Sequence, residues 1–302
     1  MIYTVTLNPA IDREYTVPEV TLDTVLRASQ TRMDPGGKGF NVARMLNVLG
    51  ESCVALGIVG GSSGKWLEQK LEAQGIETSF VWLDGETRTN TTVVPADHGE
   101  HLKVNEAGPV VSSIVQDLLL ERVVGLVQEG DWWVVAGSLP PGVPAGYYRT
   151  LIELIRDKGG HVLLDTSRAP LEQGCLARPD WIKPNLPEVQ ALTGEEDVDK
   201  ALNVLADRGV RNSLISLGKD GAMLVNEGKI NMIRSPEIVE KNPVGAGDAM
   251  VGGFVWGLHR GDSPLDACRM GIACGAMAAS QPGTDFGTSE GIMALLEKVG
   301  VE

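Results

Sequence analysis

Runs rich in Val, Ile and Leu alternate with helical segments through most of the chain, and this alternation constrains the fold more than any other feature of the sequence. The pattern is typical of βαβ units, which stack helices on a mainly parallel sheet. Strands are expected at 132–136, 161–165, 181–183 and 213–217, and helices at about 144–158, 185–193, 197–208, 247–259 and 264–281. The sequence therefore predicts an α/β protein.

Two stretches, about 11–35 and 84–108, break this rhythm with short alternating runs. Alternation of that kind is typical of antiparallel strands, so the two stretches are expected to pair into a small sheet apart from the main one. Ligands of open α/β sheets bind beyond the carboxyl ends of the strands. A small sheet lying over that edge would therefore act as a lid.

The charge and composition of the chain exclude several classes of protein. Its 302 residues carry 26 Lys and Arg against 40 Asp and Glu, a net charge of -14, which argues against nonspecific binding of nucleic acid or anionic membranes. No uncharged apolar stretch reaches the length of about 18 residues that could span a bilayer. The chain opens on a strand-like run with no secretory signal, and its four cysteines form no CxxC pair. A cytoplasmic protein without a disulfide framework or a zinc site is expected.

Glycine is unusually abundant, at 37 residues or roughly 12% of the chain where about 7% is usual. The run from Pro243 to Met250 contains Gly245, Ala246 and Gly247 and leads into an apolar helical segment. Glycines there allow backbone N–H groups to face a bound anion at a helix N-terminus. Asp248 follows directly, and a carboxylate beside an anion repels it unless the carboxylate takes part in proton transfer. The alternative is that Asp248 only caps the helix.

A second glycine-rich segment, from Asp34 to Arg44, also opens a predicted helix. Gly36 and Gly37 permit a ligand to approach the backbone closely, and Lys38 and Asn41 could reach its polar groups. The alternative is a purely structural helix entry.

Two glycine patterns fail to match the nucleotide motifs that they resemble. The run from Gly60 to Trp66 is one residue short of a P-loop and has Trp66 where Ser or Thr would bind magnesium. The segment around Gly245 lacks the third glycine of a dinucleotide fingerprint, and no predicted strand immediately precedes it. An NAD-dependent dehydrogenase is therefore disfavoured.

Two further segments have both a structural and a functional interpretation. Asn185 and Glu188 are three residues apart at the start of a predicted helix, which is the spacing of a capping interaction and equally of a pair that holds a metal and its water. The run from Ser216 to Gly221 is a strand that ends in a glycine turn, and its structural interpretation is a hairpin.

Taken together and in order, six motifs resemble those of the PfkB (ribokinase-like) sugar kinases. They are Asn8-Pro9-Ala10-Ile11-Asp12, the run from Gly36 to Arg44, Gly137-Ser138-Leu139-Pro140, the run from Lys183 to Glu188, Ser216-Leu217-Gly218 and Gly245-Ala246-Gly247-Asp248. The resemblance spans essentially the whole chain and is most specific for the branch that contains 1-phosphofructokinase, tagatose-6-phosphate kinase and the minor bacterial 6-phosphofructokinase. It implies a single domain over 1–302, with a ribokinase-like three-layer α/β/α core, a mainly parallel sheet and a small antiparallel β lid.

The resemblance also assigns roles around the nucleotide. Asp248 would be the general base that accepts the proton of the sugar hydroxyl, while Gly245, Ala246 and Gly247 would form an anion hole for the γ-phosphate. Asn185 and Glu188 would help to hold Mg²⁺. The residues implied in ATP binding are Lys183, Asn185, Ser216, Gly218, Gly221 and Ala276.

On the sugar side, the resemblance implies that Asp12 and Asn41 bind hydroxyl groups and that Gly36 and Gly37 allow close approach. The phosphate of a phosphosugar needs cations and a hydrogen-bond donor. The residues implied for it are Lys38, Arg88, Arg27 and Ser138.

The expected activity is the ATP- and Mg²⁺-dependent phosphorylation of a ketohexose monophosphate to the bisphosphate. Tagatose-6-phosphate, fructose-1-phosphate and fructose-6-phosphate all remain candidates. A kinase for an unphosphorylated sugar or a nucleoside is the alternative on the same fold, and a catalytically silent nucleotide- or sugar-binding regulator is the alternative from another class. A homodimer through the lid strands is expected, because exposed strand edges need to be covered.

Overall fold

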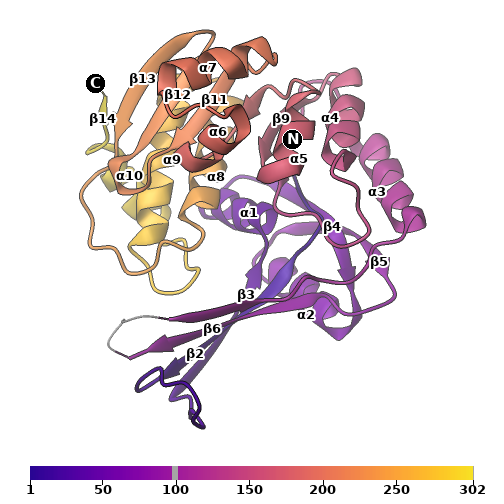
Figure 1. The fold of residues 1–302 in the computed structure, drawn as a ribbon, viewed down its shortest axis with the longest axis vertical. Coiled ribbons are helices and arrows are strands. Elements are labelled where there is room, and N and C mark those ends of the chain that lie inside the picture. The colour runs from indigo at the N-terminus through magenta and orange to yellow at the C-terminus, as the bar shows by residue number, and fades with distance from the viewer. Residues whose placement is uncertain (97–100, 302) are drawn as a thin grey trace.

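The computed structural model describes residues 1–96 and 101–301, so a short part of the expected lid stretch 84–108 lies outside the described residues. Its larger sheet has ten strands (Figure 1). In spatial order they are β14 (Gly300–Val301), β13 (Lys229–Arg234), β12 (Ala222–Asn226), β11 (Asn212–Ser216), β10 (Trp181–Ile182), β9 (His161–Asp165), β8 (Trp132–Ala136), β1 (Ile2–Thr6), β4 (Cys53–Gly60) and β5 (Glu77–Leu83).

The larger sheet is parallel from β11 to β5 and antiparallel from β11 to β14. Neighbouring residues of its strands face opposite layers: Ile2 and Val134 belong to one hydrophobic cluster, and Tyr3 and Val135 belong to the other. Because both faces are buried, the parallel strands are almost continuously apolar, which is why they could be predicted from the sequence.

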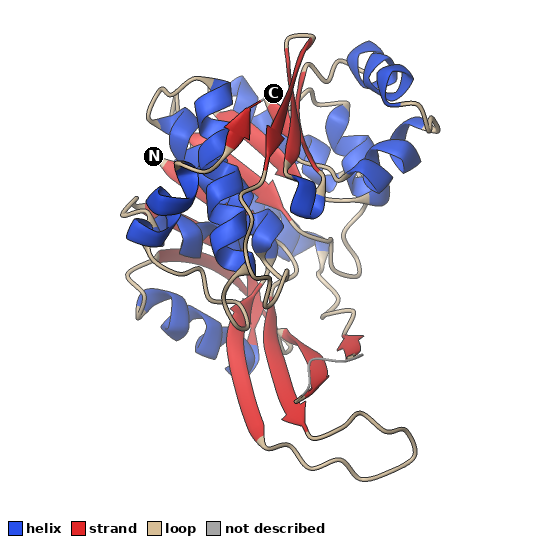
Figure 2. Ribbon diagram, turned by 90° about the vertical axis from the view of Figure 1, so that its left-hand side faces the viewer, coloured by secondary structure: helices blue, strands red, loops and turns tan. Residues whose placement is uncertain are grey.

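Helices cover both faces of the larger sheet, so the core has three layers (Figures 1 and 2). One face carries α1 (Lys38–Val48), α2 (Gly61–Glu72), α8 (Ala246–His259), α9 (Pro264–Ala279) and α10 (Ser289–Leu296). The other carries α3 (Ser113–Leu126), α4 (Tyr147–Asp157), α5 (Arg168–Cys175), α6 (Leu186–Thr193) and α7 (Val198–Asp207). The α/β/α arrangement expected from the sequence is confirmed. Among the described residues, no helix is long and apolar enough to cross a membrane.

A second, four-stranded sheet projects from the core (Figure 2). Its spatial order is β3 (Gln30–Gly36), β2 (Ala10–Val17), β6 (Arg88–Pro95) and β7 (Leu102–Asn105). The outer pairs β2–β3 and β6–β7 are antiparallel, as predicted, whereas the central pair β2–β6 is parallel. The physical reason is that β2 follows β1 and β6 follows β5, and these two parallel strands end at the same edge of the larger sheet.

Candidate active site

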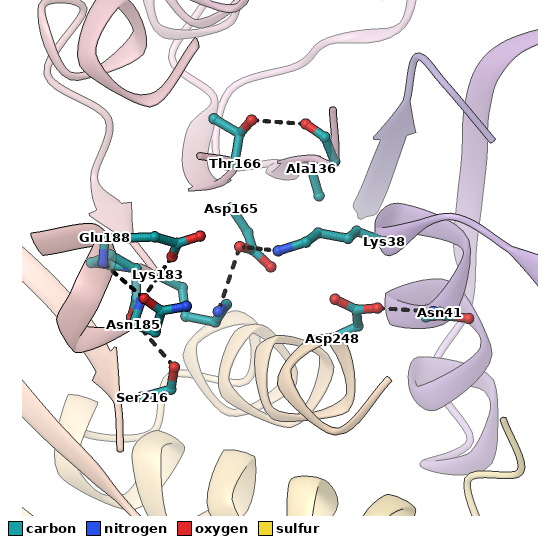
Figure 3. A network of polar contacts seen from close by, with 12 residues as sticks. Lys38, Asn41, Ala136, Asp165, Thr166, Lys183, Asn185, Glu188, Ser216 and Asp248 are labelled. Atoms are coloured by element: carbon teal, nitrogen blue, oxygen red, sulfur yellow. Dashed lines mark hydrogen bonds and ion pairs between the residues drawn. The ribbon is translucent and has the colours of Figure 1, made fainter. Parts of the chain in front are cut away.

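The helix α8 begins beside the carboxyl edge of the larger sheet and carries the predicted base in its first turn. Gly245 is the N-cap residue, and its φ of 83° lies in the left-handed region that favours glycine. Asp248 is only 9% exposed, and its Oδ2 accepts a hydrogen bond of 2.8 Å from Asn41 Nδ2 of α1 (Figure 3). Burial raises the pKa of Asp248 to about 6, while Lys38, the Asn41 hydrogen bond and Lys183 oppose the rise. Such a carboxylate can exchange a proton near neutral pH.

A second buried carboxylate, Asp165 at the end of β9, joins the two lysines of the site (Figure 3). Its Oδ1 accepts a hydrogen bond of 2.8 Å from Lys38 Nζ and lies 3.5 Å from Lys183 Nζ. Burial opposes the charged form of Lys38, but Asp165 and Asp248 outweigh it and raise the pKa of that lysine. The Lys38 ammonium group is therefore held as a cation beside Asp248.

Sequence reasoning did not select Asp165 as a site residue, because no local motif surrounds it. The signal available was its position: it is the charged last residue of a predicted apolar strand, 161–165. Side chains at the carboxyl ends of parallel strands gather at the ligand-binding edge of the sheet. Its Oδ2 is buried and has no hydrogen-bond partner within residues 1–96 and 101–301.

A cavity of about 720 Å³ lies next to the start of α8. Four of the six residues predicted to bind the nucleotide line it, namely Ser216, Gly218, Gly221 and Ala276. Ala246 and Gly247 of the predicted anion hole line the same cavity, and its size is typical of sites for small molecules. The turn from Ser216 to Gly221 is also the hairpin between β11 and β12, so its structural interpretation is confirmed.

The remaining predicted nucleotide residues lie where β10 passes into α6. Lys183 is buried against Asp165, while Asn185 is the N-cap residue of α6. Asn185 Oδ1 accepts from the Glu188 N–H at 2.8 Å, and Glu188 Oε2 accepts from the Asn185 N–H at 2.9 Å, which forms a capping box. The described residues contain no group of three or more His, Cys, Asp or Glu that could hold a metal. One carboxylate still fits Mg²⁺, which takes few protein ligands and completes its shell with water and phosphates.

At the base of the lid, the predicted sugar ligand Asp12 lies beside the two glycines predicted to allow close approach. Asp12 of β2 accepts a hydrogen bond of 2.8 Å from Asn90 Nδ2 of β6, and burial raises the pKa of Asp12. Gly36 of β3 pairs with Ala10, and a Cβ there would come 2.4 Å from Asp12 Oδ2. The next residue, Gly37, has a φ of 127° and is the N-cap of α1. A side chain at position 36 would therefore displace the Asp12 carboxylate, and the backbone at position 37 favours glycine.

The predicted phosphate ligands lie in three places, of which the first is the ion pair of Lys38 with Asp165 described above. Arg88, the first residue of β6, donates to the carbonyls of Glu106 at 2.8 Å and Asn8 at 3.0 Å. Ser138 accepts from Asn8 Nδ2 at 3.4 Å, so Arg88 and Ser138 both lie beside Asn8. Arg27 is exposed in the loop between β2 and β3. This loop lies at the far end of the lid, away from the core (Figures 1 and 2).

The segment that resembles a P-loop is closed to phosphate. Glu86 places its carboxylate at the N-terminus of α2, where it accepts from the N–H groups of Ser62 at 2.9 Å and Ser63 at 3.0 Å. These backbone hydrogen bonds lower the pKa of Glu86 to about 2. An internal anion thus occupies the helix N-terminus that an external one would need.

Fold and site together define an α/β carbohydrate kinase with a β lid. A family model described as pfkB family carbohydrate kinase matches residues 4–290. Tagatose-6-phosphate kinase from Staphylococcus epidermidis is 32% identical over 292 residues, which are 94% of each chain, and 1-phosphofructokinase from Bacillus subtilis is 33% identical over 306 residues, covering 100% of this chain and 99% of that one. The structure of phosphofructokinase-2 from Escherichia coli in complex with potassium matches with a TM-score of 0.93 and 29% identity, over 98% of each chain. The chain belongs to the pfkB family, as its motifs predicted.

Proposed function

We propose that the chain transfers the γ-phosphoryl group of ATP to a free hydroxymethyl group of a ketohexose monophosphate and so forms the bisphosphate. The observation that carries this proposal is the position of Asp248: a buried carboxylate, hydrogen-bonded to Asn41, at the helix N-terminus that borders the 720 Å³ cavity. Relatives named tagatose-6-phosphate kinase and 1-phosphofructokinase support the class of substrate.

The chain's own residues account for the chemistry that phosphoryl transfer needs, which is mainly positioning and stabilisation of charge. Asn41 donates its hydrogen bond to Asp248 Oδ2, so the proton of the sugar hydroxyl would pass to the other oxygen, Oδ1. N–H groups of the Gly245 to Gly247 turn would receive the γ-phosphate, with Lys38 and Lys183 supplying positive charge. Mg²⁺, when bound near Glu188, would neutralise the charge on the nucleotide phosphates.

The base of the lid supports a phosphosugar as the substrate, with three candidates. A ketofuranose carries hydroxymethyl groups at both ends of a nearly symmetric ring. One pocket could therefore hold the phosphate of fructose-1-phosphate, tagatose-6-phosphate or fructose-6-phosphate near Arg88 and present the other end of the sugar to Asp248. A coupled assay of ADP release over these three phosphoketoses and their unphosphorylated parents identifies the substrate.

The direct test of the base is Asp248→Asn. This change keeps the shape of the side chain and an acceptor for Asn41, but it removes proton transfer, so we expect kcat to fall by about 100-fold or more with nucleotide binding retained. Turnover is measured by ADP release and ATP binding by calorimetry. Near-normal turnover would refute the proposed mechanism, because the reaction would then not need Asp248 as its base.

The phosphosugar preference is tested by Arg88→Ala. A charged hydrogen bond to phosphate contributes about 1.5–3 kcal/mol, so we expect KM for the phosphosugar to rise about tenfold or more while KM for ATP stays constant. Arg13→Ala is the matched control, since Arg13 adjoins Asp12 on β2, faces the opposite side of the lid and contacts Tyr15 and Met33. An unchanged KM in Arg88→Ala would favour a kinase for an unphosphorylated sugar or a nucleoside.

We further propose that the protein works in the cytoplasm and as a homodimer joined through its lids. Support for the dimer comes from β7, the edge strand of the lid sheet, whose Leu102 and Val104 are 45% and 55% exposed. An apolar edge strand of that kind is a template for pairing with another chain.

A further inference from the structure

The guanidinium of Arg44 is buried next to the site, and its direct hydrogen-bond partners are all neutral. Asp34, Asp285 and Asp12 favour its charge from farther away, but burial outweighs them and lowers its pKa. Arg44 lies on α1 and is 8% exposed. Its Nη2 donates to the Thr284 carbonyl at 2.8 Å, and its Nε donates to Gln74 Oε1 at 3.3 Å. Its Nη1 lies 3.4 Å from each of three acceptors, on Pro35, Asn41 and Thr284. The guanidinium carbon stands 4.7 Å above the ring centroid of Phe286. Over the described ranges, no carboxylate forms an ion pair with Arg44.

Burying a charge without an ionic partner is unfavourable, and apolar residues of similar volume often stabilise a protein more. Arg44 nevertheless stands within the run from Gly36 to Arg44 that opens α1. A side chain of this cost therefore calls for a role beyond packing, and its hydrogen bond to Asn41 supplies one.

The amide of Asn41 has an acceptor end and a donor end, and the two ends meet different partners. Arg44 Nη1 donates to Oδ1 at 3.4 Å, and Nδ2 donates to Asp248 Oδ2 at 2.8 Å. With the amide reversed, Nδ2 would face the Arg44 donor and Oδ1 would face the carboxylate, so both contacts would become repulsive. Only one orientation satisfies both neighbours.

We propose that Arg44 is a positioning residue, which holds the Asn41 amide in the orientation that donates to Asp248 and so fixes the direction of the base. This inference rests on the proposed function, in which Asp248 is the base. The guanidinium has a second consequence, because it also contacts Pro35 at the end of lid strand β3 and stacks on Phe286. The Phe286 ring lies 3.5 Å from where a Cβ on Gly245 would stand. Arg44 thereby links the lid, the base and the anion turn.

A double-mutant cycle on Asn41→Ala and Arg44→Met tests the proposal. If Arg44 acts through Asn41, each single variant lowers kcat about tenfold or more. The kcat of the double variant is then no more than about threefold below that of the less active single variant. A double variant whose loss equals the product of the two single losses would overturn the proposal. Arg44→Lys keeps the positive charge but loses the planar set of guanidinium donors. If Arg44→Met does not fold, the same cycle is measured with Arg44→Lys and judged by the same criterion.

The pH profile of kcat gives a readout that loss of packing alone would not move. Asp248 faces Lys38 and Asn41 from α1, Asp165 from the end of β9 and Lys183 from the residue after β10. Arg44→Met alters none of these groups, yet it loosens the Asn41 hydrogen bond that favours the carboxylate, so the acid limb should move to higher pH. An unmoved limb would contradict the proposal.

Arg32→Met is the matched control for this pH measurement. Arg32 also ties β3 to the same loop, by donating to the Pro282 carbonyl at 2.9 Å, but it makes no hydrogen bond to Asn41 among the described residues. Its acid limb should stay in place, and the same shift in both variants would overturn the proposal. Asp248→Asn separates the two hypotheses: near-normal turnover refutes the proposed function, whereas lost turnover with an additive cycle refutes only the role of Arg44.

Discussion

Two buried carboxylates face the same pair of lysines but have different surroundings. Asp165 is fully buried and contacts Lys38 and Lys183 through one oxygen. Asp248 contacts Asn41 through one oxygen, and its neighbours Ala246 and Gly247 line the cavity. Of the two carboxylates, Asp248 is the one whose raised pKa suits it to proton transfer.

The raised pKa of Asp248 predicts the pH dependence of turnover. A base must be deprotonated to act, so its activity is present above its pKa and lost as the pH falls through it. With a pKa of about 6 in the free protein, kcat/KM should be half-maximal near pH 6, well above the ordinary range of an aspartate. The measurement is kcat/KM for the sugar from pH 5 to 8, with the coupling enzymes in excess at each pH. A kcat/KM that stays constant down to pH 5 would contradict the assignment.

At the scale of elements, the entrance to α8 depends on a backbone that only glycine adopts readily. Gly245 has a φ of 83°, and a Cβ there would also touch the Phe286 ring at 3.5 Å. We expect Gly245→Ala to cost about 1–2 kcal/mol of stability and to lower kcat about tenfold or more, because the turn that would receive the phosphate has to shift.

Gly261 provides the matched control for Gly245→Ala at the other end of the same helix. It has a φ of 86° and nothing within 4 Å of a Cβ, so Gly261→Ala carries the same backbone strain away from the site. Thermal unfolding and kcat are measured for both variants. Equal losses of kcat in the two would show that strain, and not the geometry of the anion turn, limits turnover.

The elements show which parts of this molecule its sequence can predict. The strands of the larger sheet were predictable because both faces of the sheet are buried and the strands are therefore apolar. The spacing of Asn185 and Glu188 had a capping interaction as one of its two interpretations, and the structure contains that capping box. The parallel pair β2–β6 was not predictable, since its direction depends on where β1 and β5 end in space. The contacts of Asp165 and Arg44 join residues far apart in the chain, and no local pattern encodes such partners.

At the scale of the whole molecule, an acidic chain places several cations beside the carboxylates of its site. The net charge of -14 belongs to the chain as a whole, whereas the groups gathered at the carboxyl edge of the sheet include Lys38, Lys183 and Arg88. Part of the glycine excess lies at the site. A Cβ at Gly36 would meet the Asp12 carboxylate, and Gly37 and Gly245 have a positive φ that other residues rarely adopt. An acidic protein can therefore hold small anions while repelling polyanions.

The projecting lid leads to a prediction about assembly. Leu102 and Val104 are two residues apart on β7, so they lie on the same face of the edge strand, and a second lid pairing there would cover them. We expect the protein to sediment as a dimer and Val104→Lys to shift it to a monomer, because a lysine on an edge strand blocks pairing. Ile230→Lys is the control, since Ile230 is 47% exposed on β13 of the other sheet. Sedimentation velocity at several concentrations decides: a dimer that survives Val104→Lys but not Ile230→Lys would move the interface from the lid to the larger sheet.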